Sequence, residues 1–158
     1  MKEQIKKIAL RTIELEARSV EGLQTSITDE FVKAVEALAA TKGRVVISGI
    51  GKSAVIAQKI VATFNSTGTP SIFMHAADAI HGDLGMIQQD DVVMILSKSG
   101  ESPEIKALVQ LIKNFGNTII AIVGNTQSIE SVLYLLYYNY VFLVKGTNQS
   151  MHYQSVSQ

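Results

Sequence analysis

Cysteine and tryptophan are absent from this 158-residue sequence, and proline occurs only twice. Without cysteine the chain has no disulfide, no thiolate nucleophile and no cysteine metal cluster. Basic and acidic residues number 14 each, so the formal net charge is zero. A neutral chain weakens the case for nucleic acid or an anionic membrane as the main partner, and we expect neither. Zero net charge does not exclude binding of a small anionic ligand, because such a ligand needs only local positive potential.

Long apolar runs are also missing. No window approaches the ~20 apolar residues that a membrane-spanning helix needs. The basic start, residues 1–7, is followed by mixed apolar and charged residues, unlike the apolar core of a signal peptide. With 47% hydrophobic and 18% charged residues, the composition is that of a globular domain able to bury its own core. We therefore expect one domain in the cytoplasm.

The hydrophobic pattern predicts strands that alternate with helices. Continuous apolar runs typical of buried strands occur at 44–48, 71–75, 91–97, 118–123 and 140–144. Helical spacing or helix-start signals mark 2–23, the stretch from Thr28, 53–65, 103–115 and 128–136. This pattern favours an α/β fold with three αβα layers around a five-stranded parallel sheet. If the strand order is 2-1-3-4-5, ligands bind beyond the carboxyl ends of the first and third strands.

The first candidate site is residues 48–53, Ser-Gly-Ile-Gly-Lys-Ser, between a predicted strand and a predicted helix. Two glycines permit a tight turn, and the helix start offers amide donors and positive dipole to an anion. The Walker A spacing is missing, and Ala54 occupies the third glycine position of a dinucleotide-binding motif. A glycine turn needed only for packing is an equally good explanation. The candidate binding residues are Ser48, Gly49, Gly51 and Ser53, with Lys52 as the adjacent charge.

The second candidate site is residues 97–104, Ser-Lys-Ser-Gly-Glu-Ser-Pro-Glu, just before a predicted helix. Hydroxyls and helix-terminal amides are the donors that a phosphate dianion requires. One serine is enough to cap a helix, so three favour a phosphate site. Acidic residues are common at helix starts because the dipole favours them, but beside a phosphate site we expect Glu104 to project toward a bound sugar. The candidate binding residues are Ser97, Ser99, Gly100, Glu101 and Ser102.

A third polar stretch, residues 78–85, contains His81 between two aspartates. A histidine serves as a general acid or base near neutral pH, or as a hydrogen-bond partner of a substrate. A lone histidine in a polar loop is more often structural, and this spacing is weak evidence for a metal. We predict no metal and no cofactor. The tyrosines near the carboxyl end fit packing better than base stacking, because no basic residues lie between them: Tyr134, Tyr137, Tyr138 and Tyr140.

Several of these segments resemble the sugar isomerase (SIS) domain. The similarity runs from about Lys2 to Val144 and is carried by STGTPS, HGDLGM and SKSGES. Within that domain the sequence is most similar to the arabinose-5-phosphate isomerase family of lipopolysaccharide and capsule sugar biosynthesis. The resemblance implies a flavodoxin-like fold and a homo-oligomer, tetramer or dimer. It also implies an isomerase, an intramolecular oxidoreductase that interconverts arabinose 5-phosphate and ribulose 5-phosphate through a cis-enediol.

The resemblance also implies roles for individual residues. The first loop matches the family at Ser48, Gly51, Lys52 and Ser53, and the phosphate-binding serines match Ser97, Ser99 and Ser102. Positions of the family's active site match Lys52, His81 and Glu104. Glu104 is the candidate base, and Lys52 is suited to stabilising the enediolate.

The resemblance ends after Val144. Lys145 and Gly146 stand where the family has an acidic residue, and the family's downstream histidine has no matching context here. We therefore expect residues 1–145 to form the phosphosugar-binding domain and residues 146–158 to be an atypical, shortened tail. Two alternatives stay open: a phosphosugar-binding domain that has lost turnover, and a structural partner that assembles through residues 2–23 and the tyrosine-rich end.

Overall fold

The computed structural model describes residues 1–124 and 141–143. The helices are α1 (Lys2–Gly22), α2 (Asp29–Ala39), α3 (Lys52–Ser66), α4 (Ala76–Ile80) and α5 (Pro103–Phe115), with the short 3-10 turns η1 (Leu23–Ser26) and η2 (Asp83–Met86). The strands are β1 (Val45–Gly49), β2 (Ser71–His75), β3 (Val92–Ser97), β4 (Thr118–Val123) and β5 (Val141–Leu143). None of the described helices is long and apolar enough to cross a membrane.

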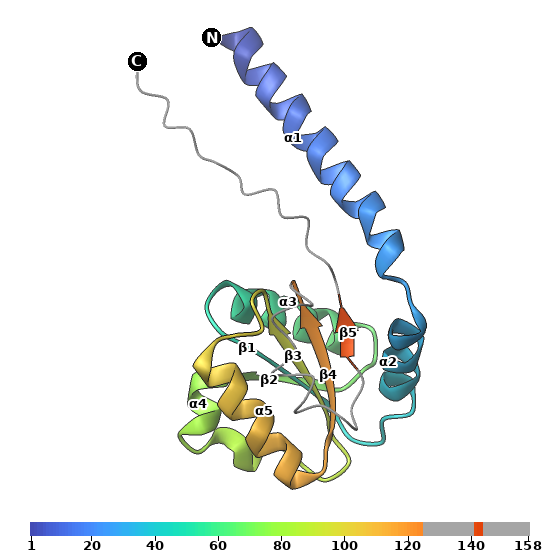
Figure 1. The fold of residues 1–158 in the computed structure, drawn as a ribbon, viewed down its shortest axis with the longest axis vertical. Coiled ribbons are helices and arrows are strands. Elements are labelled where there is room, and N and C mark those ends of the chain that lie inside the picture. Colours follow the sequence, from blue (N-terminus) through green and yellow to red (C-terminus); the bar gives the residue numbers. More distant parts are fainter. Residues whose placement is uncertain (125–140, 144–158) are drawn as a thin grey trace.

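The strands form one sheet in the order β2-β1-β3-β4-β5, and each neighbouring pair is parallel. The predicted parallel α/β architecture is therefore confirmed, and the strand order is the one assumed from the sequence. The winding direction reverses between β1 and β3. The carboxyl ends of these two strands consequently lie side by side at one edge of the sheet (Figure 1).

Helices cover both faces of the sheet. On one face Val46, Val93 and Ile119 pack with residues of α4 and α5. On the other face Val45 and Ile47, with neighbours in β3, pack with residues of α2 and α3. Successive residues of the central strands thus enter opposite cores. This explains why their sequences are continuous apolar runs without alternation.

Most predicted boundaries agree with the structure within one residue. The strands at 71–75 and 118–123 and the helix at 103–115 have the predicted limits. The prediction of a polar loop at 78–85 is wrong, because this stretch contains the end of α4 and most of η2. A helix of five residues is too short to show a hydrophobic period. The predicted helix at 128–136 and the four tyrosines lie outside the described residues.

The amino-terminal edge of the sheet is held by a buried carboxylate. Asp91 accepts hydrogen bonds from the backbone N–H and the guanidinium of Arg44, at 2.7 and 2.8 Å, and from the N–H of Gln88 at 2.9 Å. Asn117 donates from Nδ2 to the Asp91 carbonyl at 2.9 Å. Arg44 also donates to the Met86 carbonyl at 2.7 Å. These bonds join the starts of β1, β3 and β4 to the end of η2.

The environment of Asp91 favours its ionised form. Burial acts to raise the pKa of the carboxyl, but the hydrogen bonds from Arg44 and Gln88 and the charge of Arg44 outweigh it and lower the pKa below its ordinary value. Ionised Asp91 therefore stabilises the folded chain at neutral pH. This stabilisation is present above the unfolded pKa of ~3.9 and is lost as the pH falls through the lower folded pKa.

Candidate functional site

Strand register brings the two candidate loops to the same edge of the sheet. Gly49, the last residue of β1, pairs with Leu96 of β3, and Ser97 follows directly. The loop after β1 and the loop after β3 therefore leave adjacent strands. On the other side of β1, Gly49 pairs with His75, the last residue of β2. The residues that the sequence predicted in two separate segments form one contiguous edge.

Two helix amino termini flank this edge. α3 begins at Lys52 and covers one face, and α5 begins at Pro103 and covers the other. The helices have 15 and 13 residues, long enough for a developed dipole. Both positive ends are directed toward the carboxyl edge of β1 and β3. Together they produce local positive potential in a chain without net charge, which is what a bound phosphate needs.

The two glycines of the first loop have distinct structural reasons. A Cβ on Gly49 would come within 3.0 Å of the Ser53 carbonyl carbon, so glycine lets the first turn of α3 approach the strand end. Gly51 has a φ of 56°, in the left-handed region that favours glycine, and a Cβ there would meet no atom within 4 Å. Packing therefore explains Gly49, whereas Gly51 leaves open space at the helix start.

The second loop is organised by its own serines. The Gly100 N–H donates to Ser97 Oγ at 3.0 Å, and the Glu101 N–H donates to Ser99 Oγ at 3.2 Å. A hydroxyl that accepts a hydrogen bond still has a proton to donate. Ser102 occupies the N-cap of α5, but its side chain makes no capping bond. Helix capping therefore does not account for Ser102, and an anion is a suitable acceptor for the hydroxyls of Ser97 and Ser102.

The end of β4 supports this loop from the side. The Gly124 N–H donates to the Lys98 carbonyl at 3.1 Å, and a Cβ on Gly124 would come within 2.7 Å of that oxygen. Glycine at this position therefore allows the chain to pass directly against the loop. The loop backbone is thus fixed at both ends, by the start of α5 and by the end of β4.

Ser48 is a buried hydroxyl without a hydrogen-bond partner. The residue is 0% exposed, and its Oγ makes no hydrogen bond within the described part of the chain. Strand alternation places it on the same face as Val46 of β1 and, through the pairing with Ile95, on the same face as Ser97. A buried orphan hydroxyl costs free energy and calls for an explanation. A ligand group seated at the α5 side of this edge would supply the missing partner.

Replacing Ser48 by alanine therefore has an unusual expected result. The free energy of unfolding should stay unchanged or rise by up to ~1 kcal/mol, because the variant removes an unpaired buried hydroxyl. Affinity for a phosphosugar should fall about fivefold to tenfold, since one hydrogen bond to the ligand is lost. Urea unfolding and calorimetry measure the two effects. Ser66→Ala, at the far end of α3, is the control. A Ser48→Ala variant that loses stability but keeps its affinity for the phosphosugar would contradict a hydrogen bond from Ser48 to the ligand.

His75 is a candidate that sequence reasoning missed. It ends β2 beside Gly49, on the face covered by α3, and its ring packs edge-on to Phe73. Its Nδ1 is buried and has no hydrogen-bond partner among the described residues, since the carboxylate of Asp78 lies 3.8 Å away. In the sequence His75 is the last residue of an apolar strand. Only its pairing with Gly49 identifies it as a residue of this edge.

The three predicted catalytic residues come from three different elements. Lys52 is exposed at the first turn of α3, and Glu104 is half-buried in the first turn of α5. His81 is exposed at the C-cap of α4, which packs on the same side as α5. These three side chains make no hydrogen bond or ion pair with one another in the described part of the chain. In this structure they therefore do not form a preassembled triad.

Glu101 differs from Glu104 in its surroundings. Its carboxylate forms an ion pair with Lys106 of α5, so its charge is already neutralised locally. Glu104 makes no such pair within the described residues. In the same part of the chain no group of three histidine or acidic side chains is arranged to hold a metal ion. Of the two acidic residues in this segment, Glu101 is therefore the one with an ion pair among the described residues.

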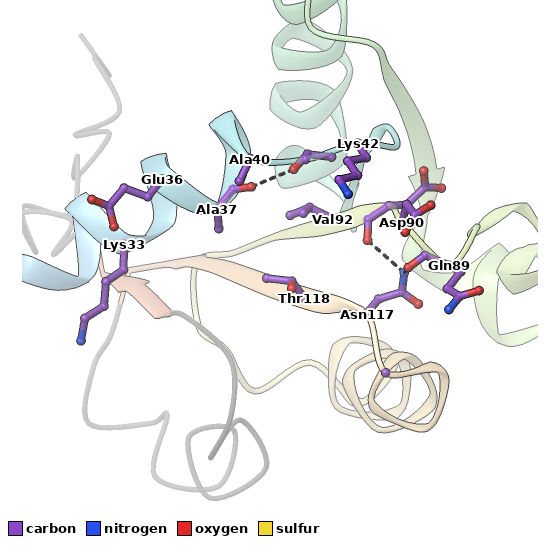
Figure 2. A pocket seen from close by; sticks show the side chains of 13 residues that line it. Lys33, Glu36, Ala37, Ala40, Lys42, Gln89, Asp90, Val92, Asn117 and Thr118 are labelled. Carbon is purple, nitrogen blue, oxygen red and sulfur yellow. Dashed lines mark hydrogen bonds between the residues drawn. The ribbon is translucent and has the colours of Figure 1, made fainter.

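A cavity of about 550 Å³ lies at the opposite, amino-terminal edge of the sheet (Figure 2). Its walls come from the carboxyl end of α2, the turn before β3 and the start of β4, with Lys33, Lys42, Glu36 and Asp90 among the lining side chains. Charges of both signs line it, and Asp91, which also lines it, already forms an ion pair with Arg44. Because the dipoles and hydroxyls converge at the other edge, we assign no ligand to this cavity.

Comparisons with known proteins agree with the architecture. The family described as SIS domain matches residues 38–131. The arabinose 5-phosphate isomerase KdsD of Pseudomonas aeruginosa is 55% identical over 120 residues, which cover 76% of this chain and 37% of that protein. The arabinose 5-phosphate isomerase KpsF of Escherichia coli O6:H1 is 43% identical over 119 residues, covering 75% of this chain and 36% of that protein. The chain thus spans little more than a third of the length of these curated relatives.

A solved structure is also similar. The Escherichia coli CFT073 protein c3406, in complex with arabinose 5-phosphate, superposes with a TM-score of 0.79 at 37% sequence identity. The match covers 90% of this chain and 74% of that chain. The similarity therefore extends over nearly the whole chain.

Proposed function

Because the chain belongs to the sugar isomerase (SIS) domain family, we propose that it binds a pentose 5-phosphate at the edge formed by residues 49–53 and 97–102. The observation that carries this proposal is the pairing of Gly49 with Leu96, since it brings both loops and both helix starts together. The phosphate accepts hydrogen bonds from the serines of the second loop and from helix amides. The sugar carbons then lie toward Lys52 and Glu104. The complex of the related protein with arabinose 5-phosphate supports this ligand class.

The proposed reaction is the interconversion of D-arabinose 5-phosphate and D-ribulose 5-phosphate. Glu104 removes the proton from the carbon next to the carbonyl and returns it to the neighbouring carbon, through a cis-enediol. Lys52 stabilises the negative charge that develops on the oxygen, and His81 exchanges protons with the oxygens. The phosphate is remote from the reacting carbons, so its binding energy serves to position them. The names of the curated relatives support this reaction.

A second candidate function is phosphosugar binding without turnover. It is favoured by the tail, because Lys145 and Gly146 stand where the family has an acidic residue. In that case the chain senses or holds the phosphosugar. The loops keep their role under both proposals, and only the fate of the bound sugar differs.

Calorimetry and an isomerisation assay on the same sample separate these functions. Ribulose 5-phosphate should bind. Ribulose without phosphate should bind at least about tenfold more weakly, because the proposed hydrogen bonds from the loops and helix amides go to the phosphate. Conversion to arabinose 5-phosphate supports the isomerase. Binding without conversion rejects the isomerase and supports the second candidate. The absence of affinity for any pentose or hexose phosphate would overturn both.

The proposal also includes a homo-oligomer, dimer or tetramer, located in the cytoplasm. A chain with no net charge has little electrostatic repulsion between its copies. The lack of cysteine is compatible with a reducing compartment.

A further inference from the structure

α1 is a helix of 21 residues that buries none of them. It extends away from the sheet and its covering helices (Figure 1). Its large apolar side chains are 56–68% exposed: Ile5, Ile8, Leu10, Ile13 and Val20. Helices in proteins owe most of their stability to packing of an apolar face, and an isolated helix of this length is marginal in water. The apolar side of α1 therefore needs a cover that the described part of the chain does not supply.

One side of α1 carries a line of exposed residues that are mainly apolar. Ile5, Ala9, Ile13 and Val20 follow helical spacing along one side, while Leu15 on another side is half-buried. Glu16 lies on this line between Ile13 and Val20, and Lys6 lies at its margin, so each half of the helix carries one of the two charges. Lys6 has only an exposed ion pair with Glu3, at 3.3 Å, and Glu16 has no ion pair within residues 1–124. Both charges can therefore pair with another molecule.

Charge is distributed unevenly along α1. The first half, residues 2–11, carries four basic residues and one acidic residue, and the second half, residues 12–22, carries three acidic residues and one basic residue. Two copies side by side in parallel would place like charges together. Two copies in antiparallel orientation place the basic half of each against the acidic half of the other. Such charge patterns select partner orientation in helical pairs.

We propose that α1 binds the α1 of a second copy of this chain in antiparallel orientation, centred near Arg11. In this register Ala9 of each copy faces Ile13 of the other, and the small alanine permits close approach. The same register sets Lys6 of each copy against Glu16 of the other. This contact includes no residue of the proposed phosphosugar site, so its test is independent of the proposed ligand and reaction. It rests on the proposed function only in that it specifies a surface for the expected homo-oligomer.

Sedimentation equilibrium of the full chain tests the pairing with two charge reversals. Lys6→Glu and Glu16→Lys should each raise the dissociation constant of the dimer about tenfold, since each places two like-charged pairs in the interface. The double variant should return to near the parent value, because in the antiparallel pair the reversed residues face each other. Lys59→Glu, an exposed reversal on α3, is the matched control and should change nothing.

Each sedimentation result either supports or contradicts antiparallel pairing of α1. A parent chain that is monomeric at all concentrations would overturn it and would indicate that another molecule, or another part of a longer protein, covers α1. A dimer insensitive to both reversals would place the interface elsewhere. Weakening by both single variants without recovery in the double variant would exclude the antiparallel orientation. Circular dichroism of each variant confirms folding, and calorimetry with ribulose 5-phosphate shows that the binding site is intact.

Discussion

Glu104→Gln is expected to lower kcat for ribulose 5-phosphate by about 10²–10⁴-fold, the usual contribution of a general base. Affinity for the phosphosugar should change by less than about threefold, because glutamine keeps the size of the side chain and the proposed phosphate-binding residues are unchanged. Glu104 lies in the first turn of α5, directly after the serine loop, and forms no ion pair within the described residues. Steady-state kinetics with calorimetry separates the effect on turnover from the effect on binding.

Glu36→Gln is the matched control for this variant. Glu36 lies on α2 beside the cavity at the opposite edge of the sheet, so its replacement should leave kcat and affinity unchanged. Lys52→Ala should lower kcat as well, through loss of the charge that stabilises the enediolate. Parent-level turnover in both Glu104→Gln and Lys52→Ala would reject the roles proposed for them.

Asp91→Ala is expected to lower the free energy of unfolding by about 3 kcal/mol, because the loss of one partner of a buried network is strongly destabilising. The carboxylate is 1% exposed and accepts hydrogen bonds from the backbone of Arg44 and Gln88 as well as from the Arg44 side chain. The variant would leave the amides of Arg44 and Gln88 without their acceptor, and the Arg44 guanidinium would keep only the Met86 carbonyl. Urea unfolding followed by circular dichroism measures the change.

Asp90→Ala is the control for Asp91, because Asp90 is the exposed neighbour in the same turn. Its effect should stay within ~0.5 kcal/mol. A loss of similar size in both variants would show that the turn matters and the buried network does not.

The pH dependence tests the charge of Asp91 separately. The difference in unfolding free energy between the parent and Asp91→Asn should be constant from about pH 7 to about pH 5 and should shrink below about pH 4. The sign follows from the lowered pKa of Asp91, which makes the ionised form the stabilising one. A difference that grows on acidification would contradict this assignment.

The sequence predicted local structure well, because local signals determine it. Pro103 at the first turn and Gly116 with a φ of 79° at the end delimit α5, and both boundaries are visible in the sequence. The short helix α4 was missed because five residues contain no complete hydrophobic period. The serine-rich loop at residues 97–102 was singled out from its sequence as a candidate site, although the hydrogen bonds from Gly100 and Glu101 to two of its serines were not foreseen.

By itself the sequence determined the alternation of apolar strands and helices, the two loops with their hydroxyls and glycines, and the uneven charge of the first helix. Only the tertiary structure decided that Ser48 shares a face with Ser97, that His75 stands beside Gly49, and that Asp91 holds Arg44 across 47 residues. The physical reason is that the central strands are buried on both faces. Their side chains show no alternation from which a face could be inferred, and register between strands is set by packing among segments far apart in the chain.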